Sequence, residues 1–341
     1  MEKNSFVLIN KNNLINNIKN LTNKYGDYEY YFGVVKANGY GHGYDIIDIL
    51  LENGINYLAV ADIGEALEIR EKNKDVKILI LEPVSLDELY TCYENNFTIT
   101  ISDYAYYLKV SLSGIKLNFH LKIDSGMHRL GLSDPKEIMS IYNNKNNLYM
   151  EGVFSHFATE NDDYVETQIN NFKRLTAPLK DVPIIHMANS FNMVKHPKIP
   201  FCNGCRLGLA MYGFFDDNKE TFNLVSNILQ IKDVKADDLI SYGAKIKLGH
   251  DGRIAIIGIG YSDGVYKKSV GRYVTINNKK YKILAICMNM AIIEIDKSVS
   301  ILDSVYFIGR QTDVKYVSDY LNIEPYEVLS IVNPKLKRVI K

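Results

Sequence analysis

Short apolar runs alternate with amphipathic stretches along the first two thirds of the chain. The amphipathic stretches have helical spacing, as at Ile46, Ile49 and Leu50, where Gly54 supplies a C-terminal stop. Eight apolar runs that alternate with such helices predict a (β/α)8 barrel that ends near residue 217. The runs are Tyr31–Val35, Tyr57–Ala61, Val76–Leu81, Phe97–Ile101, Leu117–Ile123, Tyr149–Phe154, Ile184–Met187 and Leu207–Tyr212.

A doubly wound open sheet is the alternative arrangement for alternating strands and helices. It needs fewer strands, and a Gly-x-Gly-x-x-Gly turn after the first strand would favour it. The turn that follows Tyr31–Val35 lacks this pattern, so the barrel is the preferred prediction. One more apolar strand is predicted at Phe6–Ile9, and residues 1–10 fit either the barrel or a second domain.

The pattern changes after Asn218. Short β-branched runs, separated by turns such as Asp251-Gly252, predict a β domain with a helical segment at Val317–Leu329. We therefore predict an α/β protein with a (β/α)8 barrel over residues 1–217 and a mostly β C-terminal domain over residues 218–341. The runs of the second domain are Leu224–Val234, Ile254–Ile259, Tyr273–Ile276, Ile283–Ile286, Ile292–Ile295 and Ser304–Ile308.

The composition narrows the class of protein. Forty basic residues balance forty acidic ones in 341 residues, so nothing favours nucleic acid or an anionic membrane as a partner. No apolar run approaches the length of about 18 residues that a membrane span needs, and no signal-peptide pattern is present. Four cysteines fit a reducing cytoplasm. Cys202 and Cys205 have zinc-ligand spacing but no second Cys or His pair, so we predict no metal site.

Unusual polar residues follow the predicted barrel strands, at the end of a barrel where function sits. The first is Lys36, which leads into a glycine-rich turn where a ligand can approach the backbone closely. A single Lys or His at a strand end is more often solvated or structural. Polar clusters at five strand ends, however, make coincidence a poor explanation. The clusters are Lys36–Gly43, His120–Gly131, Ser155–Ala158, His186–Ser190 and Arg206–Leu209.

This set of side chains suits one kind of chemistry. An amine such as Lys36 forms a Schiff base with the aldehyde of pyridoxal phosphate (PLP), which then acts as an electron sink for a carbanion. Ser190 and the backbone near Gly208 can hold a phosphate after strands seven and eight. An Arg beside the pyridine nitrogen would keep that nitrogen unprotonated. The resulting weak sink suits a reaction that removes and returns one proton.

These motifs resemble those of the alanine racemases, PLP enzymes built on a barrel. They occur in the family's order across nearly the whole chain. The matching segments are Lys36–Gly43, Lys122–Gly131, Ser155–Ala158, His186–Ser190, Arg206–Gly213, Ser241–Ala244, Gly260–Gly264 and Cys287–Met288.

The resemblance implies two catalytic bases. Lys36 would be the Schiff-base lysine and one base, and Tyr242 from the other subunit of a homodimer would be the second base. His156 would hydrogen-bond that Tyr, and Arg206 would pair with the pyridine nitrogen. A free Tyr has a pKa of roughly 10, so positive neighbours must lower it.

The resemblance also implies the binding residues. Tyr40, Ser190 and the backbone of Gly208 and Leu209 would bind the phosphate of PLP. Arg129 and the backbone N–H of Met288 from the partner would hold the substrate carboxylate. Lys122, which is carbamylated in many members, would orient Arg129, and Tyr261 would line the entrance.

Three short segments depart from the family pattern. The Asp that follows the family's Met is Asn289 here, and Leu284-Ala285 replaces a Gly-Arg. A family Tyr near the C-terminus falls on Asn333 or Pro334. Related serine racemases resemble this stretch, with Asn in place of the Tyr, and an Asn offers both a donor and an acceptor to a substrate hydroxyl. The departures bear on substrate range.

We therefore expect a PLP-dependent racemase that interconverts L- and D-alanine by a two-base mechanism and supplies D-alanine for cell-wall synthesis. The expected partners are an amino-acid substrate and a second copy of the chain, in the cytoplasm. The first alternative is a serine or broad-range racemase. A PLP decarboxylase of the same fold is less favoured, because its substrate motifs are not evident. A PLP carrier without turnover would lack the C-terminal domain that carries Tyr242.

Overall fold

The computed structural model describes residues 4–144, 146–215 and 217–341, and the chain divides into two compact units. The first, called here the barrel unit, comprises Ile15–Gly39 and Ile46–Lys219. The second, called the β unit, contains the N-terminal residues up to Leu14, the segment Tyr40–Asp45 and Glu220–Lys341. The segment Tyr40–Asp45 therefore belongs to the β unit although barrel elements precede and follow it in sequence.

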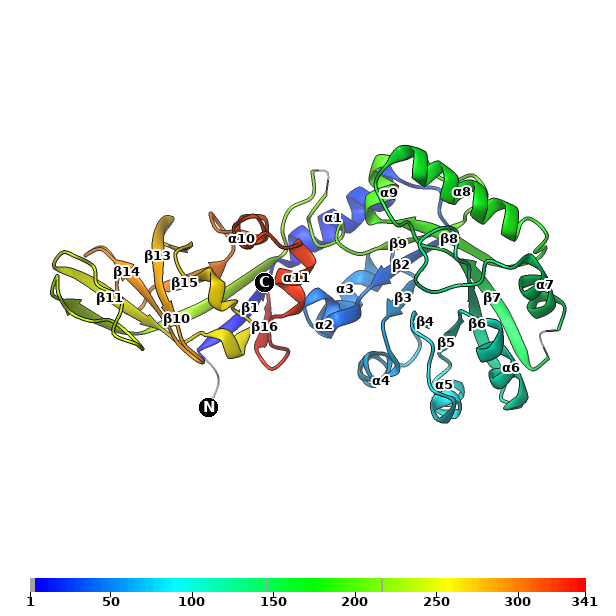
Figure 1. Cartoon of the computed structure of the whole chain (residues 1–341), viewed down its shortest axis with the longest axis horizontal. Helices are drawn as coiled ribbons and strands as arrows, with labels where there is room; N and C mark the ends of the chain where they lie inside the picture. Colours follow the sequence, from blue (N-terminus) through cyan, green and yellow to red (C-terminus); the bar gives the residue numbers. More distant parts are fainter. Residues whose placement is uncertain (1–3, 145, 216) are drawn as a thin grey trace. The chain divides into compact units, whose positions relative to one another are not determined.

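The barrel unit is a closed barrel of parallel strands, which confirms the predicted (β/α)8 architecture (Figure 1). Each strand pairs with the next in chain order, and the first pairs with the last, so that Tyr31 lies opposite Cys205. The strands are β2 (Tyr30–Val34), β3 (Tyr57–Val60), β4 (Ile78–Ile80), β5 (Thr98–Ile101), β6 (Leu117–Lys122), β7 (Leu148–Phe154), β8 (Ile184–Asn189) and β9 (Gly204–Leu207).

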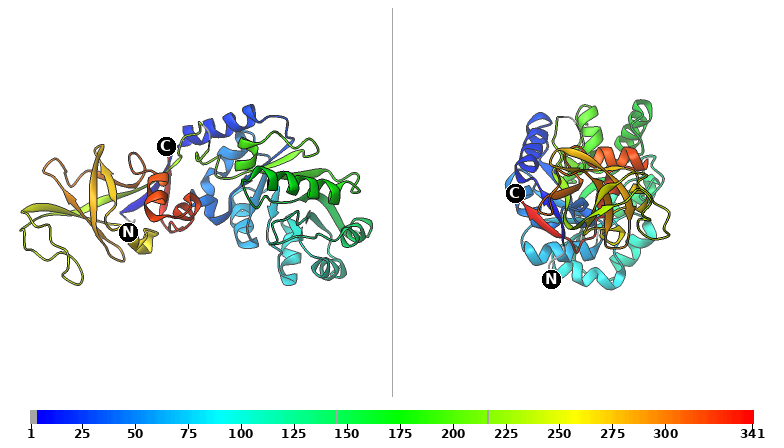
Figure 2. Two further views of the ribbon diagram at one scale, coloured as in Figure 1. Left: turned by 45° about the horizontal axis from the view of Figure 1, so that its top comes forward. Right: turned by 90° about the vertical axis from the view of Figure 1, so that its left-hand side faces the viewer.

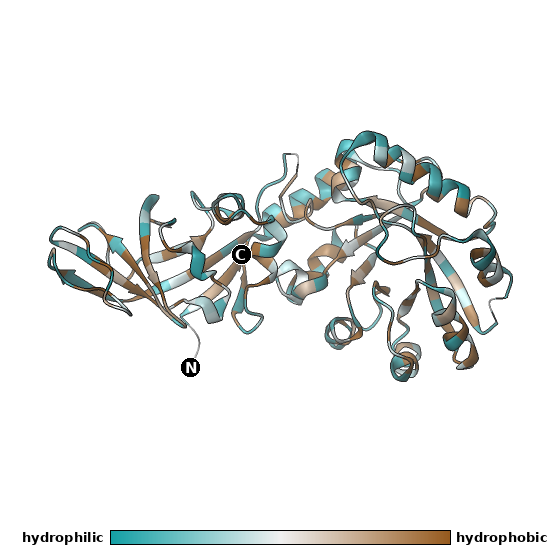
Figure 3. Cartoon of the chain, viewed as in Figure 1, coloured by the Kyte–Doolittle hydropathy of each residue, from teal (hydrophilic) through white to brown (hydrophobic). Residues whose placement is uncertain are grey.

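Helices lie around the outside of the strands (Figure 2). Helix α8 is amphipathic: Val165 and Phe172 are buried, whereas its charged residues are exposed. Figure 3 shows both hydrophobic (brown) and hydrophilic (teal) residues along this helix. The helices up to β9 are α1 (Lys11–Lys24), α2 (Lys36–Tyr40), α3 (Ile47–Glu52), α4 (Ile63–Lys72), α5 (Leu89–Glu94), α6 (Tyr104–Leu112), α7 (Pro135–Asn143), α8 (Asp162–Thr176) and α9 (Ser190–Lys195).

The predicted position of the eighth strand was wrong. The strand is β9, Gly204–Leu207, and the apolar run that follows it forms tight turns rather than a strand. The N–H of Met211 donates to the carbonyl of Gly208, and the N–H of Tyr212 donates to that of Leu209, both at 3.0 Å. The run is apolar because these turns are buried, and hydrophobicity alone does not distinguish a buried turn from a buried strand.

The β unit contains an eight-stranded sheet in the order β11-β14-β13-β12-β15-β10-β1-β16, with β11 also paired to β10. This confirms a mostly β second domain. The early strand β1 (Ser5–Ile9) pairs antiparallel with β10 (Phe222–Val234). The final strand β16 (Lys337–Ile340) was not predicted, because its charged residues interrupt the apolar pattern. The others are β11 (Gly252–Ile257), β12 (Tyr273–Ile276), β13 (Lys279–Ile286), β14 (Ala291–Ile295) and β15 (Ser304–Ile308).

The C-terminal helical segment is two helices rather than the one that was predicted. Helix α10 (Val314–Leu321) ends at Asn322, which is left-handed with φ 54°, and α11 (Pro325–Ser330) begins with a proline. A left-handed cap and a proline at the first position are ordinary helix boundaries. None of the helices in the described part of the chain combines the length and hydrophobicity that a bilayer crossing requires.

Candidate active site

The chain turns sharply after β2, where segment α2 is left-handed. φ lies between 50° and 60° at the four residues that follow Lys36. The N–H of Gly39 closes the turn by donating to the carbonyl of Val35 at 2.7 Å. Lys36 itself is exposed, but desolvation and the nearby Arg129 lower the pKa of its amine below the ordinary value. The turn therefore presents an amine that is easier to deprotonate than a free lysine.

Arg206 lies in β9 and is buried. Its guanidinium donates to three carbonyl oxygens, those of Ser155, His186 and Met187. It also donates to Nδ1 of His186 at 2.9 Å and to Nδ1 of His156 at 3.0 Å. All five acceptors are neutral, so these hydrogen bonds orient the cation without neutralising it. Burial lowers the pKa of Arg206 to about 10, which leaves it charged at neutral pH.

His156 follows β7 and is held by α8. Gln168 donates to the carbonyl of His156 at 3.1 Å and accepts from the N–H of Ala158 at 2.9 Å. Desolvation and Arg206 hold the pKa of His156 well below its usual value, so the ring is neutral. Since a guanidinium can only donate, Nδ1 of His156 accepts and Nε2 carries the proton. The ring can therefore donate from Nε2 to a further oxygen.

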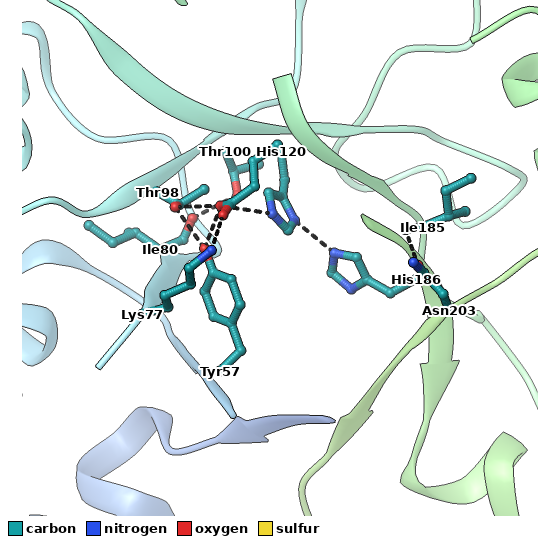
Figure 4. A network of polar contacts seen from close by, with 10 residues as sticks. Tyr57, Lys77, Ile80, Thr98, Thr100, His120, Ile185, His186 and Asn203 are labelled. Atoms are coloured by element: carbon teal, nitrogen blue, oxygen red, sulfur yellow. Dashed lines mark hydrogen bonds and ion pairs between the residues drawn. The ribbon is translucent and has the colours of Figure 1, made fainter. Parts of the chain in front are cut away.

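A chain of polar groups continues from His186 through the barrel (Figure 4). Nε2 of His186 lies 2.9 Å from Nδ1 of His120, and Nε2 of His120 lies 3.5 Å from the carboxylate of Glu151. The ring of His186 is stacked between Phe32 and Phe154, with centroid distances of 4.5 and 4.9 Å. The carboxylate also accepts hydrogen bonds from Tyr57 Oη (2.7 Å), Thr98 Oγ1 (2.9 Å) and Lys77 Nζ (2.8 Å).

The proton positions in this chain follow from its two ends. Arg206 donates to Nδ1 of His186, so His186 carries its proton on Nε2 and donates to His120. His120 then carries its proton on Nε2, on the side of Glu151. Burial lowers the pKa of both imidazoles. Burial alone would raise the pKa of Glu151, but hydrogen bonds from His120, Lys77 and Tyr57 lower it. Two neutral rings thus join a cation to an anion.

The sequence interpretation gave neither His120 nor Glu151 a role. The available signal was the pair Glu151-Gly152, which interrupts the apolar run of β7. The structure explains the glycine, because a Cβ at Gly152 would lie 2.6 to 2.8 Å from ring atoms of His120. A polar residue beside a glycine in a buried strand therefore indicates a side chain packed closely on that backbone.

Lys122 ends β6 and is buried, whereas Arg129 lies exposed in the loop that follows. Asp124 shapes this loop by accepting hydrogen bonds from the backbone N–H groups of residues 126–128 at 2.9 to 3.1 Å. Burial, followed by the charges of Arg206 and Arg129, lowers the pKa of Lys122 to about 7. A large fraction of this amine is therefore neutral at neutral pH, which is the form that can react with carbon dioxide.

Ser190 begins α9 directly after β8. Asn189 caps this helix by accepting the N–H of Asn192 at 3.0 Å. The hydroxyl of Ser190 accepts the N–H of Gly208 at 2.7 Å, so its own proton remains to be donated. Leu209 follows in the turn after β9. The N–H of Gly208 is thus engaged by Ser190, and the hydroxyl proton of Ser190 is the donor left for a ligand.

Three loops of the β unit meet at one place. The N–H groups of Tyr261 and Ser262 donate to the carbonyls of Cys287 and Met288 at 3.0 and 2.9 Å. The hydroxyl of Ser241 lies 3.7 Å from the sulfur of Cys287. These contacts bring the loop of Tyr242 to the loops of Tyr261 and Met288.

The side chains of these loops are unusually exposed for their type. Tyr242 is 89% exposed, Met288 56% and Tyr261 44%. Ser241 and Ala244, on either side of the Tyr242-Gly243 pair, are left-handed with φ of 66° and 47°. Exposed aromatic and apolar side chains that gather on one surface indicate a contact with another molecule.

Asn333 also belongs to this cluster. Its backbone N–H donates to the carbonyl of Asp263 at 3.2 Å, and its amide nitrogen donates to the carbonyl of Ser262 at 2.8 Å. Its amide oxygen accepts the N–H of Lys335 at 2.9 Å. Asn289 joins the same loop by donating to the hydroxyl of Ser262 at 2.8 Å. Both ends of the Asn333 amide therefore hold the backbone of the β unit.

Tyr40 is the first residue of the segment that belongs to the β unit. The next residue, Gly41, accepts hydrogen bonds at its carbonyl from Nε and Nη2 of Arg338 at 3.1 and 3.0 Å. A Cβ at Gly41, where φ is 76°, would lie 2.4 Å from the carbonyl oxygen of Leu329. The β unit thus fixes the backbone beside Tyr40.

The polar groups of the barrel unit match the chemical groups of PLP. Lys36 offers an amine to an aldehyde, the hydroxyl of Ser190 offers a donor to a phosphate, and Arg206 offers a guanidinium to a ring nitrogen. The uncompensated charge of Arg206 is the most specific of these features. The donor set therefore fits this cofactor.

Comparison with known proteins agrees with the geometry. The models of the alanine racemase N-terminal and C-terminal domains match residues 9–215 and 221–340. The alanine racemase of Fusobacterium nucleatum is 35% identical over 359 residues, which cover 98% of this chain and 99% of that protein. The structure of alanine racemase from E. faecalis has a TM-score of 0.93 at 26% identity, covering 99% of this chain and 98% of that one.

A histidine racemase from Leuconostoc mesenteroides has a TM-score of 0.92 at 22% identity, covering 99% of this chain and 98% of that one, and it shares the fold. The two domain models together cover nearly the whole chain. The chain belongs to the alanine racemase family of PLP-dependent amino-acid racemases.

Proposed function

We propose that this chain is a PLP-dependent racemase that interconverts L- and D-alanine. The observation that carries the proposal is the set of partners of Arg206, which are all neutral. When bound, PLP supplies an electron sink for a carbanion at the substrate Cα. A buried guanidinium facing the ring nitrogen gives up no proton to it, which keeps the sink weak. A weak sink favours the removal and return of one proton over decarboxylation.

Lys36 is the first of the two proposed bases. It follows β2 directly and leads into the left-handed turn at that end of the barrel. Desolvation and Arg129 lower the pKa of Lys36, so less free energy is required to make it a base near neutral pH. Lys36 would also hold the cofactor covalently between turnovers.

Tyr242 is the second proposed base, and it would act in the site of a partner chain. Its side chain is 89% exposed, and a second copy of the chain would bury it. His156 can donate from Nε2 to a tyrosine oxygen, which would stabilise the phenolate form. We infer that the enzyme is a homodimer whose sites are shared, because two bases must lie on opposite faces of one planar carbanion.

The substrate carboxylate would be held by Arg129 and by the N–H of Met288 from the partner. Arg129 is exposed at the end of a loop shaped by Asp124, and Lys122 lies buried at the root of that loop. A carbamate on Lys122 would turn a buried amine into an anion able to orient Arg129. Tyr40 and Ser190 would hold the phosphate.

Alanine is the preferred substrate in this proposal, and serine is the alternative. The argument for serine required the amide of Asn333 to meet a substrate hydroxyl. One N–H of that amide donates to Ser262 and its oxygen accepts from Lys335, so these two bonds hold the side chain against the backbone of the β unit. Alanine needs no such partner, since its side chain is a methyl group.

A substrate panel tests the proposal. The purified protein, loaded with PLP, is incubated with each enantiomer of alanine and of serine, and the products are separated on a chiral column. We expect both alanine enantiomers to give the same racemic mixture, with a higher kcat/KM than serine. Release of carbon dioxide and an amine, or no reaction by a fully loaded protein, would refute the proposal.

A further inference from the structure

The turn after Lys36 contains residues that are in an unfavourable backbone conformation. Ala37, Asn38 and Tyr40 are all left-handed, with φ of 52°, 54° and 50°, and only Gly39 among the four is a glycine. The left-handed conformation is unfavourable for residues that carry a Cβ, and consecutive left-handed residues are rarer than a single one. Such a conformation persists only where the surroundings hold it in place.

The carboxylate of Glu65 is the group that holds this turn. Its Oε1 accepts the N–H of Ala37 at 2.5 Å, and the N–H of Asn38 also bonds the carboxylate. Its Oε2 accepts the N–H of Ala61 at 2.8 Å. Ala61 follows strand β3, so one carboxylate joins the backbone that leaves β2 to the backbone that leaves β3. Both loops are at the end of the barrel where Lys36 lies.

Glu65 is itself held in place by helix α4. Its backbone N–H donates at 3.0 Å to Asp62, the N-cap of that helix. Glu65 lies in the first turn of α4, where the helix dipole favours a negative charge. Burial raises the pKa of Glu65, whereas the N–H groups of Ala61, Ala37 and Asn38 oppose that rise. The carboxylate is thus partly desolvated and committed to backbone donors.

We propose that Glu65 is a positioning residue that holds the left-handed turn and thereby aims the amine of Lys36. This inference rests on the proposed function, in which Lys36 carries PLP. The carboxylate acts on the backbone N–H groups of Ala37 and Asn38 and not on the reacting atoms.

The need for a carboxylate, rather than any polar side chain, follows from the donors that it meets. The backbone N–H groups of Ala37 and Ala61 approach different oxygens of Glu65. A glutamine has one oxygen and one NH2 group, so one of the two N–H groups would face another donor. Glu65→Gln therefore keeps the size of the side chain and breaks one of the two links.

Hydrogen exchange of the cofactor-free protein tests the inference without any catalysis. We expect Glu65→Gln to speed exchange about tenfold in peptides that contain residues 36–40, with little change in distant strands, because one charged hydrogen bond is lost. PLP affinity should fall about tenfold as well, measured by the visible absorbance of the lysine adduct. Glu68→Gln, an exposed change on the same helix, is the matched control.

A second substitution tests whether backbone strain in the left-handed turn is the reason that Glu65→Gln weakens PLP binding. Ala37→Gly removes the Cβ from a left-handed residue, so the turn should depend less on Glu65. The double variant should recover most of the PLP affinity that Glu65→Gln loses. Additive effects of the two changes, or unchanged exchange in Glu65→Gln, would overturn the inference. A parent protein that binds no PLP would instead refute the proposed function, and the exchange data would still decide the role of Glu65.

Discussion

The guanidinium of Arg206 and Nδ1 of His186 lie 2.9 Å apart, and Arg206 can only be the donor. This one hydrogen bond sets the tautomer of His186, and through it the tautomer of His120, up to the carboxylate of Glu151. The Arg206 cation is therefore linked through two neutral imidazole rings to an anion deep in the barrel. We expect changes at the far end of this chain to reach Arg206.

Glu151→Gln tests that link. A glutamine can donate to His120, which would reverse both tautomers and place a proton on Nδ1 of His186, facing Arg206. We expect kcat to fall about tenfold with a smaller change in KM. The 15N shifts of the two imidazoles, measured by NMR, should move from the Nε2–H to the Nδ1–H pattern.

Lys77→Met is the control for that variant. It removes the half-exposed partner of Glu151 but keeps the carboxylate, so the two tautomers should stay as they are. Unchanged imidazole shifts in a folded Glu151→Gln protein would show that the chain does not transmit the change.

Lys122 should make stability depend on pH. Its pKa is about 7 in the folded chain, mainly because of burial, against an ordinary value of 10.5. Between these values the unfolded chain binds the proton and the folded chain does not, so stability falls as the pH drops from 10.5 to 7. In buffer free of carbon dioxide, the melting temperature of the parent should fall over this range relative to Lys122→Met. Parallel curves would mean that Lys122 keeps its ordinary pKa.

Carbon dioxide supplies a second test of Lys122. A neutral buried amine beside Arg129 and Arg206 should form a carbamate, which those cations would stabilise. After incubation with 13C-labelled bicarbonate, a carbamate signal should appear in the parent and be absent in Lys122→Met. A parent without that signal would remove Lys122 from the proposed site.

Asn333 should act on stability rather than on specificity. Asn333→Ala loses hydrogen bonds to Ser262 and Lys335, each worth about 1 kcal/mol, so the melting temperature should fall. The ratio of kcat/KM for serine to that for alanine should stay close to the parent value. A several-fold change of this ratio, with little loss of stability, would make Asn333 a specificity residue.

The shared site can be tested by complementation. Lys36→Ala and Tyr242→Phe chains, each inactive alone, should regain activity when they form heterodimers, because one site would then hold both bases. Tyr242 is 89% exposed, so its substitution should not change the melting temperature of a single chain. No recovery in a preparation shown to contain heterodimers would place both bases in one chain.

Much of the fold could be predicted from the hydrophobic pattern, since apolar runs that alternate with amphipathic stretches indicated the barrel. The eighth strand was misplaced because Leu207–Tyr212 is as apolar as a strand yet buried as turns. Strand β16 escaped prediction because Lys337 and Arg338 break its pattern, although pairing with β1 makes it a strand. Whether such a segment forms a strand depends on pairing with distant strands, which the local sequence pattern does not reveal.

Only some residues of the candidate site could be singled out from the sequence. Lys36 and Ser190 stood out because they follow buried strands. Arg206 stood out because it precedes the apolar run Leu207–Tyr212, and the structure places it inside β9. Glu65 and Glu151 were missed because their partners are backbone groups or residues distant in sequence. The left-handed run after Lys36 was also invisible, since only one of its four residues is a glycine.

Proton exchange in 2H2O measures the proposed reaction at the substrate Cα itself. The PLP-loaded parent is given L-alanine or D-alanine, and both deuterium at Cα and the enantiomer are measured. Each enantiomer should yield the other with solvent deuterium at Cα, and Lys36→Ala should yield neither. Tyr242→Phe should still exchange the Cα proton of one enantiomer without inverting it, because one face keeps its base. A PLP-loaded parent that leaves the Cα proton of alanine untouched would contradict the proposed racemisation.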